Sequence, residues 1–273
     1  MAVDKISNIQ TKGLIRFSYL AKNGFVLSKQ GLEEARSVLY DPARLDRRFR
    51  LFETLTLPSL AVQDDPDFAL AVLIGSDFPD TARARLEDLL RDFKAAKIVA
   101  MPPRVHIKAV VDAYEALPTR HSATHIATFR LDDDDAMHRG ATARIKALAS
   151  ALLAVRTTDK PFAIAFNRGF YFDPDNADAP LQEVYERHPL GVGMAVVAGR
   201  ADRANVFRRN HRNVAQFYDT YTEVDLPMFV RSVHGDNDSG AQNSGRAGKM
   251  APGRMRRIVR DDFGINLRDL EAL

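Results

Sequence analysis

The chain has 273 residues, no cysteine and a formal net charge of only +3. The lack of cysteine excludes disulfides, thiolate metal sites, iron–sulfur clusters and a thiol nucleophile. A charge so near balance does not by itself indicate nucleic-acid binding, and no apolar run approaches the ~20 residues of a membrane span. Because residues 1–10 lack the apolar core of a signal peptide, we expect a cytoplasmic protein.

The first half of the chain alternates apolar strands with amphipathic helices. Four strands are predicted, at 14–19, 69–75, 97–101 and 124–131. Helices are predicted between them, with apolar faces at 32–39, 44–57, 86–93 and 107–114, and Pro58 ending the second. This alternation predicts an α/β fold with a mostly parallel central sheet and right-handed crossovers, as in a Rossmann-like nucleotide-binding unit.

The second half is less regular. Its predicted elements are a helix at 141–155, a hairpin of 162–166 with 169–172, a strand at 193–197, a helix at 203–219, a loop at 235–253 and a basic helix and tail at 255–273. The sequence shows no internal repeat and no linker, so we expect a single domain spanning 1–273. It would comprise a nucleotide-binding half at about 10–140, a more antiparallel acceptor half at about 141–240, and a flexible loop with a basic tail at 241–273.

Four consecutive aspartates, Asp132 to Asp135, follow the predicted strand that ends at Leu131. Adjacent carboxylates repel one another, by about 1 kcal/mol for each close pair in water and by more when partly buried. Ligands of parallel sheets gather at the carboxyl ends of the strands, and hard divalent cations prefer carboxylate oxygens. The run therefore indicates a metal-bound phosphate site, with an acidic surface turn as the alternative.

Several familiar kinds of phosphate site fit the acidic run less well. The sequence contains neither a Gly-x-x-x-x-Gly-Lys-Ser/Thr loop nor a Gly-x-Gly-x-x-Gly motif. A phosphatase that forms an aspartyl-phosphate would carry its motif after the first strand of the core. A two-metal nuclease would need further carboxylates, which no pattern singles out. What remains is a nucleotide-diphosphate site in which a metal holds the pyrophosphate.

Residues 131–136 resemble the Asp-x-Asp-Asp motif of GT-A-fold glycosyltransferases. Residues 50–60, followed by Gln63 and the strand at 69–75, resemble more narrowly the bacterial family named putative rhamnosyltransferases, and 128–132 and 233–237 fit the same family. This resemblance covers most of residues 14–240. It implies a GT-A-like domain and a hexosyltransferase that moves a sugar, nominally rhamnose, from a nucleotide-sugar donor to a glycan or lipid-linked acceptor.

The resemblance also implies a metal site. Asp134 and His234 would hold Mn²⁺ or Mg²⁺, with a loop histidine that has no partner as the alternative for His234. Asp132 would lie nearer the nucleoside, and Asp133 or Asp135 would hold the loop, bind ribose or sugar, or face water. An ion there would neutralise the charge that builds on the leaving diphosphate.

Further residues are candidates for donor binding and catalysis. Arg130 precedes the acidic run and could pair with a carboxylate or a phosphate, and Arg104 follows another strand and could meet the nucleotide. Phe17 and Ser18 could wall the base pocket, although an ordinary core role suits the aromatic ring equally well. An inverting transferase needs a carboxylate base. Asp225 is the first choice, and the other acids of the acceptor half are Asp173, Glu183 and Glu186.

Two basic clusters are open to several interpretations. One comprises Arg208, Arg209, His211 and Arg212, and the other Arg246, Lys249, Arg254, Arg256, Arg257 and Arg260. Each could be a solvated face, an arm that folds over the diphosphate, or a peripheral contact with an anionic inner membrane. Nucleic acid is least favoured, because no aromatic residues are interleaved with the basic ones.

Two other functional classes stay open on the sequence. A catalytically silent module would bind a nucleotide-sugar or another polyanion without turning it over. A metal-dependent phosphoesterase would release phosphate from simple esters and would need no acceptor.

Overall fold

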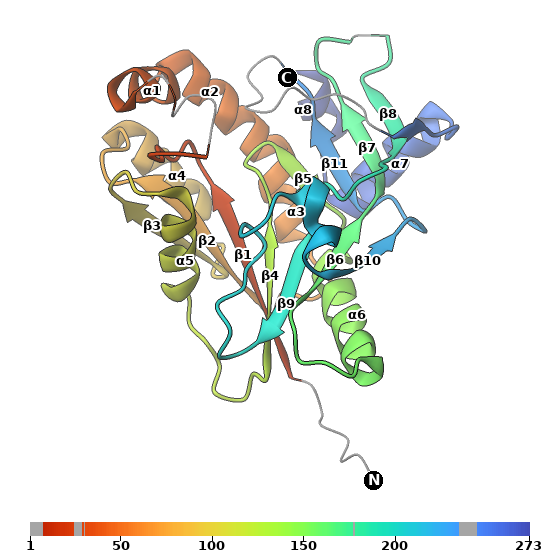
Figure 1. Cartoon of the computed structure of the whole chain (residues 1–273). Coiled ribbons are helices and arrows are strands. Elements are labelled where there is room, and N and C mark those ends of the chain that lie inside the picture. The colour runs from red at the N-terminus through yellow and green to blue at the C-terminus, as the bar shows by residue number, and fades with distance from the viewer. Residues whose placement is uncertain (1–7, 25–28, 30, 177, 235–244) are drawn as a thin grey trace.

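The computed structural model describes residues 8–24, 29, 31–176, 178–234 and 245–273, which form a mixed α/β structure with two sheets (Figure 1). In the seven-stranded sheet, with the order β3-β2-β1-β4-β9-β6-β10, only β9 runs antiparallel to its neighbours. Its strands are β1 (Ile9–Arg16), β2 (Phe68–Gly75), β3 (Ala96–Met101), β4 (His125–Arg130), β6 (Phe162–Phe166), β9 (Ala195–Gly199) and β10 (Asp219–Glu223). The predicted α/β class with a mostly parallel central sheet is confirmed.

Helices cover both faces of this sheet. Helix α5 (His106–Glu115) packs on one face, and α2 (Pro42–Leu51), α4 (Asp80–Leu90) and α6 (Ala141–Val155) pack in the larger core on the other. The other helices are α1 (Leu32–Leu39), α3 (Leu57–Ala61), α7 (Pro252–Phe263) and α8 (Leu267–Glu271), of which α7 and α8 pack in a separate core. Side chains alternate between the two faces, so Leu14 of β1 packs with α5 while Ile15 packs in the larger core with α4 and α6. Burial on both faces explains the continuous apolar runs of the sequence.

The second sheet is smaller and mixed. Its order is β12-β8-β7-β11-β5, and only β7 and β11 pair in parallel. The strands are β5 (Asp135–Met137), β7 (Arg168–Phe172), β8 (Leu181–Tyr185), β11 (Phe229–Ser232) and β12 (Arg246–Ala247). The second half is therefore the more antiparallel part, as predicted, although the division into two functional halves stays a prediction.

The predicted hairpin of 162–166 with 169–172 is wrong, because its two strands belong to different sheets. The chain passes from β6 to β7 through buried Asn167, whose amide donates to the carbonyl of Glu223 at 2.8 Å. The carbonyl of Asn167 accepts from the amide of Glu186 at 2.7 Å. The backbone groups of Asn167 are thus hydrogen-bonded to residues distant in sequence, and the two strands do not pair with each other.

The predicted helix at 203–219 is also wrong. The segment is a loop with a 3₁₀ turn at His211–Gln216, and β10 begins at Asp219. Asn205 accepts the amide of Phe207 at 3.1 Å, and Asn210 accepts the amide of Arg212 at 2.9 Å. Such local side-chain bonds to the backbone compete with helix formation.

Pro58 does not end the helix predicted at 44–57. A π-helical turn at Phe52–Thr56 follows α2, and Pro58 lies in the first turn of α3, where its missing N–H is tolerated. The basic helix predicted within 255–273 is present as α7, and the short helix α8 follows it. Helices α7 and α8 pack into a core with Met255, Val259, Phe263 and Leu270. Part of the predicted loop, 235–244, lies outside the described residues.

Every helix in the described part of the chain is too short or too polar to cross a bilayer.

Gly13 of β1 provides a test of the central packing. A Cβ at this position would lie 2.3 Å from the ring of Phe129, whereas a Cβ at Gly199 of β9 would meet nothing within 4 Å. We expect Gly13→Ala to lower the free energy of unfolding by about 1–3 kcal/mol, because the buried ring must shift. Gly199→Ala is the matched control and should cost nothing. Urea denaturation measures both, and equal stabilities of the two variants would contradict this packing.

Candidate functional site

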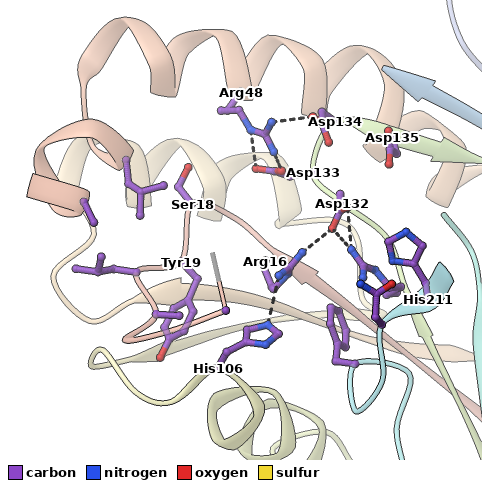
Figure 2. A pocket seen from close by; sticks show the side chains of 18 of the residues that line it. Arg16, Ser18, Tyr19, Arg48, His106, Asp132, Asp133, Asp134, Asp135 and His211 are labelled. Carbon is purple, nitrogen blue, oxygen red and sulfur yellow. Dashed lines mark hydrogen bonds and ion pairs between the residues drawn. The ribbon is translucent and has the colours of Figure 1, made fainter. Parts of the chain in front are cut away.

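A cavity of about 380 Å³ lies at the carboxyl ends of β1 and β4 (Figure 2). Its wall includes the whole acidic run, Asp132 to Asp135. Among the described residues, seven arginines also line it, namely Arg16, Arg44, Arg48, Arg130, Arg208, Arg209 and Arg231. Since arginines outnumber the aspartates, the cavity has a net positive charge and is suited to an anionic ligand.

Asp132 is held by two arginines that end neighbouring parallel strands. Arg16 Nη2 donates to Asp132 Oδ1 at 3.0 Å, and Arg130 Nη2 donates to Oδ2 at 3.0 Å. The ring of Phe207 lies against both guanidinium groups, at 5.1 Å from Arg16 and 5.0 Å from Arg130. One acid and one ring therefore fix two arginines side by side in the cavity wall.

The next two aspartates share a different arginine. Arg48 of α2 donates from Nε to Asp133 Oδ2 at 3.2 Å and from Nη1 to Asp134 Oδ2 at 2.7 Å. Asp134 Oδ2 also lies 3.0 Å from His234 Nε2, which follows β11. Asp135 accepts the backbone amide of Ser232 at 3.1 Å. The repulsion expected within the acidic run is thus offset by fixed arginines and a backbone donor.

These contacts shift the pKa values of three of the four carboxyl groups in different directions. Burial opposes ionisation of Asp132, but Arg130 and Arg16 outweigh it and hold its pKa well below the usual value. Burial likewise opposes ionisation of Asp134, whose pKa is lowered by Arg48 and by the hydrogen bond with His234. Burial together with the neighbouring acids Asp134 and Asp132 raises the pKa of Asp135 well above its usual value.

Two histidines of the cavity wall are held neutral. Burial, reinforced by the charges of Arg16 and Arg130, lowers the pKa of His106 to about 3. Burial and the charge of Arg130 lower the pKa of His211 to about 3 as well. Neutral His106 can accept at Nε2 from Arg16 Nη1, 3.3 Å away, which assigns its ring proton to Nδ1.

We expect the two histidines to make stability depend on pH. Their native pKa values lie below the unfolded value of about 6.5, so the unfolded chain binds protons first and stability falls as pH drops from about 6.5 toward 3. Between pH 7 and pH 5 each should cost roughly 1–2 kcal/mol, after allowance for partial exposure. Urea titrations of the wild type and of the His106→Gln, His211→Gln double variant measure this. An unchanged pH slope in the double variant would contradict it.

The structure brings most of the predicted site residues together. Ser18, Arg130 and Asp132 to Asp134 line the cavity, and His234 contacts Asp134. Ser18 has a φ of +46°, an unusual conformation for a residue other than glycine, and its Oγ accepts from Arg44 at 3.2 Å. Such backbone strain is more frequent at functional sites than elsewhere.

Three predicted residues lie elsewhere. Phe17 is fully buried in the core, because β1 ends at Arg16 and the ring packs 4.7 Å from that of Phe49. Arg104 is exposed and paired with Asp112 on α5. Asp225 is exposed in the loop after β10, where its carbonyl accepts from Arg168 Nη1 at 2.5 Å. The cavity wall includes none of the three among its described residues.

Several residues of the site were not predicted from the sequence. They are Arg16, Arg44, Arg48, His106, Phe207 and Arg231. A signal was present for two of them, since Arg44 and Arg48 lie one turn apart in a predicted helix and share a face. Arg16 would have been recognised as a site residue if the first strand had been predicted to end at Arg16 rather than at Tyr19.

A divalent ion fits part of this site. Within the described residues no group of three or more His, Cys, Asp or Glu side chains could hold a metal. Asp134 Oδ2 and His234 Nε2 nevertheless converge to 3.0 Å. Two protein donors are enough for Mg²⁺ or Mn²⁺ when substrate phosphates and waters complete the shell. The residues fit an ion that binds together with a diphosphate, and the ion itself stays a prediction.

Comparison with known families identifies the chain. A family model described as "Putative rhamnosyl transferase" matches residues 10–246. The chain belongs to this family. The match confirms the resemblance inferred from residues 50–75 and 128–132, and the α/β structure with its second, mixed sheet agrees with the GT-A-like fold that the resemblance implied.

This member of the rhamnosyl transferase family was also compared with curated sequences and with solved structures. No curated sequence matches it. Solved structures similar to it include residues 1–349 of S. aureus TarS in complex with UDP-GlcNAc, with a TM-score of 0.43 and 12% identity over 92% of this chain and 64% of that one. Another TarS crystal structure gives a TM-score of 0.43 and 11% identity over 83% of this chain and 37% of that one. The chain thus spans less than two thirds of each.

Proposed function

We propose that this protein is a glycosyltransferase that moves a sugar from a nucleoside-diphosphate-sugar donor to a glycan or glycolipid acceptor. The observation that carries the proposal is the arginine-lined cavity that ends on the acidic run after β4. Membership of the rhamnosyl transferase family supports the class of reaction. Rhamnose as the transferred sugar is proposed on the family description alone.

The cavity suits the diphosphate of such a donor. Arg16 and Arg130 are fixed side by side by Asp132 and Phe207, so they can meet phosphate oxygens without losing much side-chain freedom. Charge-assisted hydrogen bonds from guanidinium groups to phosphate are about twice as strong as neutral ones. As the bond to the sugar breaks, the same arginines stabilise the charge that develops on the leaving diphosphate.

Asp134 and His234 would hold Mn²⁺ or Mg²⁺ in this proposal. The ion would act as a Lewis acid on the diphosphate oxygens. Neutral His106 and His211 complete the wall near Asp132 without adding charge. The exposed position of Asp225 gives it no place in the cavity, so we assign no base to the acceptor hydroxyl.

A ligand screen followed by an activity assay tests the function. Thermal shifts with UDP, GDP, dTDP and CMP, each with and without Mn²⁺, identify the nucleotide. Donor sugars carrying that nucleotide are then incubated with the protein, and released nucleoside diphosphate is measured. We expect one nucleoside diphosphate to raise the Tm and its sugar to be consumed, with the loss of turnover in excess EDTA.

Two other results would point away from the proposed transferase, and a third would contradict only its ion. Binding without turnover of any donor would favour the silent binding module. Phosphate release from simple esters, without a need for a nucleotide-sugar, would favour the phosphoesterase. Full activity in EDTA would contradict the proposed ion while leaving the transferase intact.

A further inference from the structure

Arg48 makes an unusual set of contacts for a residue beside a predicted metal site. Its Nε and Nη2 both donate to Asp133, and its Nη1 donates to Asp134 Oδ2 at 2.7 Å (Figure 2). The Arg48 side chain is only 11% exposed and that of Asp133 only 1%. The guanidinium therefore lies in the protein interior, fixed by two carboxylates of the acidic run.

The contact with Asp134 involves the oxygen that an ion would need. Asp134 Oδ2 accepts from Arg48 and also lies 3.0 Å from His234 Nε2, so it is the point where the two predicted metal ligands converge. An ion bound there would share this carboxylate with a guanidinium group. Like charges this close repel strongly when they are poorly solvated, and arginine cannot relieve the repulsion by losing its proton.

Asp133 prevents Arg48 from moving away. If the guanidinium swung out to solvent, the buried carboxylate of Asp133 would lose its partner, which is costly in a protein interior. Arg48 therefore stays beside Asp134, where its positive charge opposes a second cation. Additional negative charge from a diphosphate would offset its effect.

From these contacts we propose that Arg48 competes with the metal ion for Asp134, so that the ion is retained only when a diphosphate is bound beside it. The inference rests on the proposed function, which supplies both the ion and the diphosphate. It assigns Arg48 a positioning role that makes binding of the two ligands interdependent. By linkage, each ligand then strengthens the binding of the other.

Thermal shifts of the wild-type protein give the first test. Mn²⁺ alone should leave the Tm unchanged, a nucleoside diphosphate should raise it, and the two together should raise it further than the nucleotide does. A Tm raised as much by Mn²⁺ alone as by the pair would overturn the inference. So would equal shifts from the nucleotide with and without Mn²⁺, although that result would leave nucleotide binding standing. A nucleotide that never shifts the Tm would contradict both proposals.

A second test measures Mn²⁺ binding directly by electron paramagnetic resonance, without nucleotide. Arg48→Met should bind Mn²⁺ about tenfold more tightly than the wild type, because the competing charge is gone. Arg48→Lys keeps a charge and should stay close to the wild type. Arg44→Met is the matched control. It removes an arginine from the same helix and cavity, but Arg44 contacts Ser18 rather than the acidic run, so Mn²⁺ affinity should not tighten.

The Arg48→Met variant needs a control for folding, because it leaves the buried carboxylate of Asp133 without its guanidinium partner. The double variant Arg48→Met, Asp133→Asn removes both charges and should show the same tightening in a folded protein, with circular dichroism as the check. Mn²⁺ affinity equal to or weaker than the wild type in the folded double variant would overturn the competition. Tightening of the same size in Arg44→Met would also overturn it, because the effect would then reflect only net charge.

Discussion

Replacing Arg130 with Ala is expected to raise the dissociation constant for a nucleoside diphosphate about 100-fold, or ~2.7 kcal/mol. The guanidinium of Arg130 is fixed in the cavity wall by Asp132 at 3.0 Å and by the ring of Phe207. Its removal takes away a charge-assisted donor to phosphate. It also leaves Asp132 with one fewer cation, so that this carboxylate repels the ligand more strongly.

Isothermal titration calorimetry with the nucleotide found by thermal shift measures this effect. Arg200→Ala is the matched control, since Arg200 is exposed after β9 and donates to the carbonyl of His121 at 2.8 Å. The control should bind like the wild type. Equal affinities in Arg130→Ala and Arg200→Ala would show that the ligand does not bind in the cavity.

The second large effect concerns catalysis at Asp134. We expect Asp134→Asn to lower kcat for donor turnover by roughly 100- to 1000-fold, the size seen when one electrostatic stabiliser of a transition state is removed. The carboxylate is the meeting point of Arg48 and His234, and the isosteric amide can neither neutralise Arg48 nor offer an anionic oxygen to an ion. Because Arg48 keeps its contacts with Asp133, the fold should persist.

Steady-state kinetics of Asp134→Asn and Asp225→Asn compare the effect on kcat of a carboxylate in the cavity with that of an exposed one. Asp225 is exposed and outside the described wall of the cavity, so its variant should turn over donor at the wild-type rate. Circular dichroism confirms that both variants are folded. Near-normal kcat in Asp134→Asn would contradict the assigned site, and a large loss in Asp225→Asn would restore Asp225 as a candidate base.

The sequence predicted the parallel strands β1 to β4 of the large sheet well, because strands that are buried on both faces read as continuous apolar runs. The run at 69–75 corresponds to β2 at Phe68–Gly75, and helix 32–39 to α1 at Leu32–Leu39. The second half was predicted less well. Its strands are distributed between two sheets, and no local pattern shows that Asn167 marks the passage from one sheet to the other.

The candidate site was predicted only in part, because a sequence shows local runs of residues but not which distant residues converge. Acids in one run at the end of a strand are visible as a pattern, and the sequence located them correctly at the cavity. The cations that neutralise them are scattered over Arg16, Arg48 and Arg130, and their convergence depends on tertiary structure. The sequence pattern pointed to a metal as the main neutralising charge, with Arg130 as a candidate partner of a carboxylate, whereas three arginines contact the acidic run. The pairing of His234 with Asp134 came only from the family resemblance.

The decisive measurement is a crystal structure of the protein with the nucleoside diphosphate that raises the Tm most, soaked with Mn²⁺. We expect the diphosphate in the cavity against Arg16 and Arg130, with manganese density between Asp134 and the phosphate oxygens. A nucleotide bound elsewhere on the protein, with Asp132 to Asp135 distant from any ligand, would contradict the proposed site.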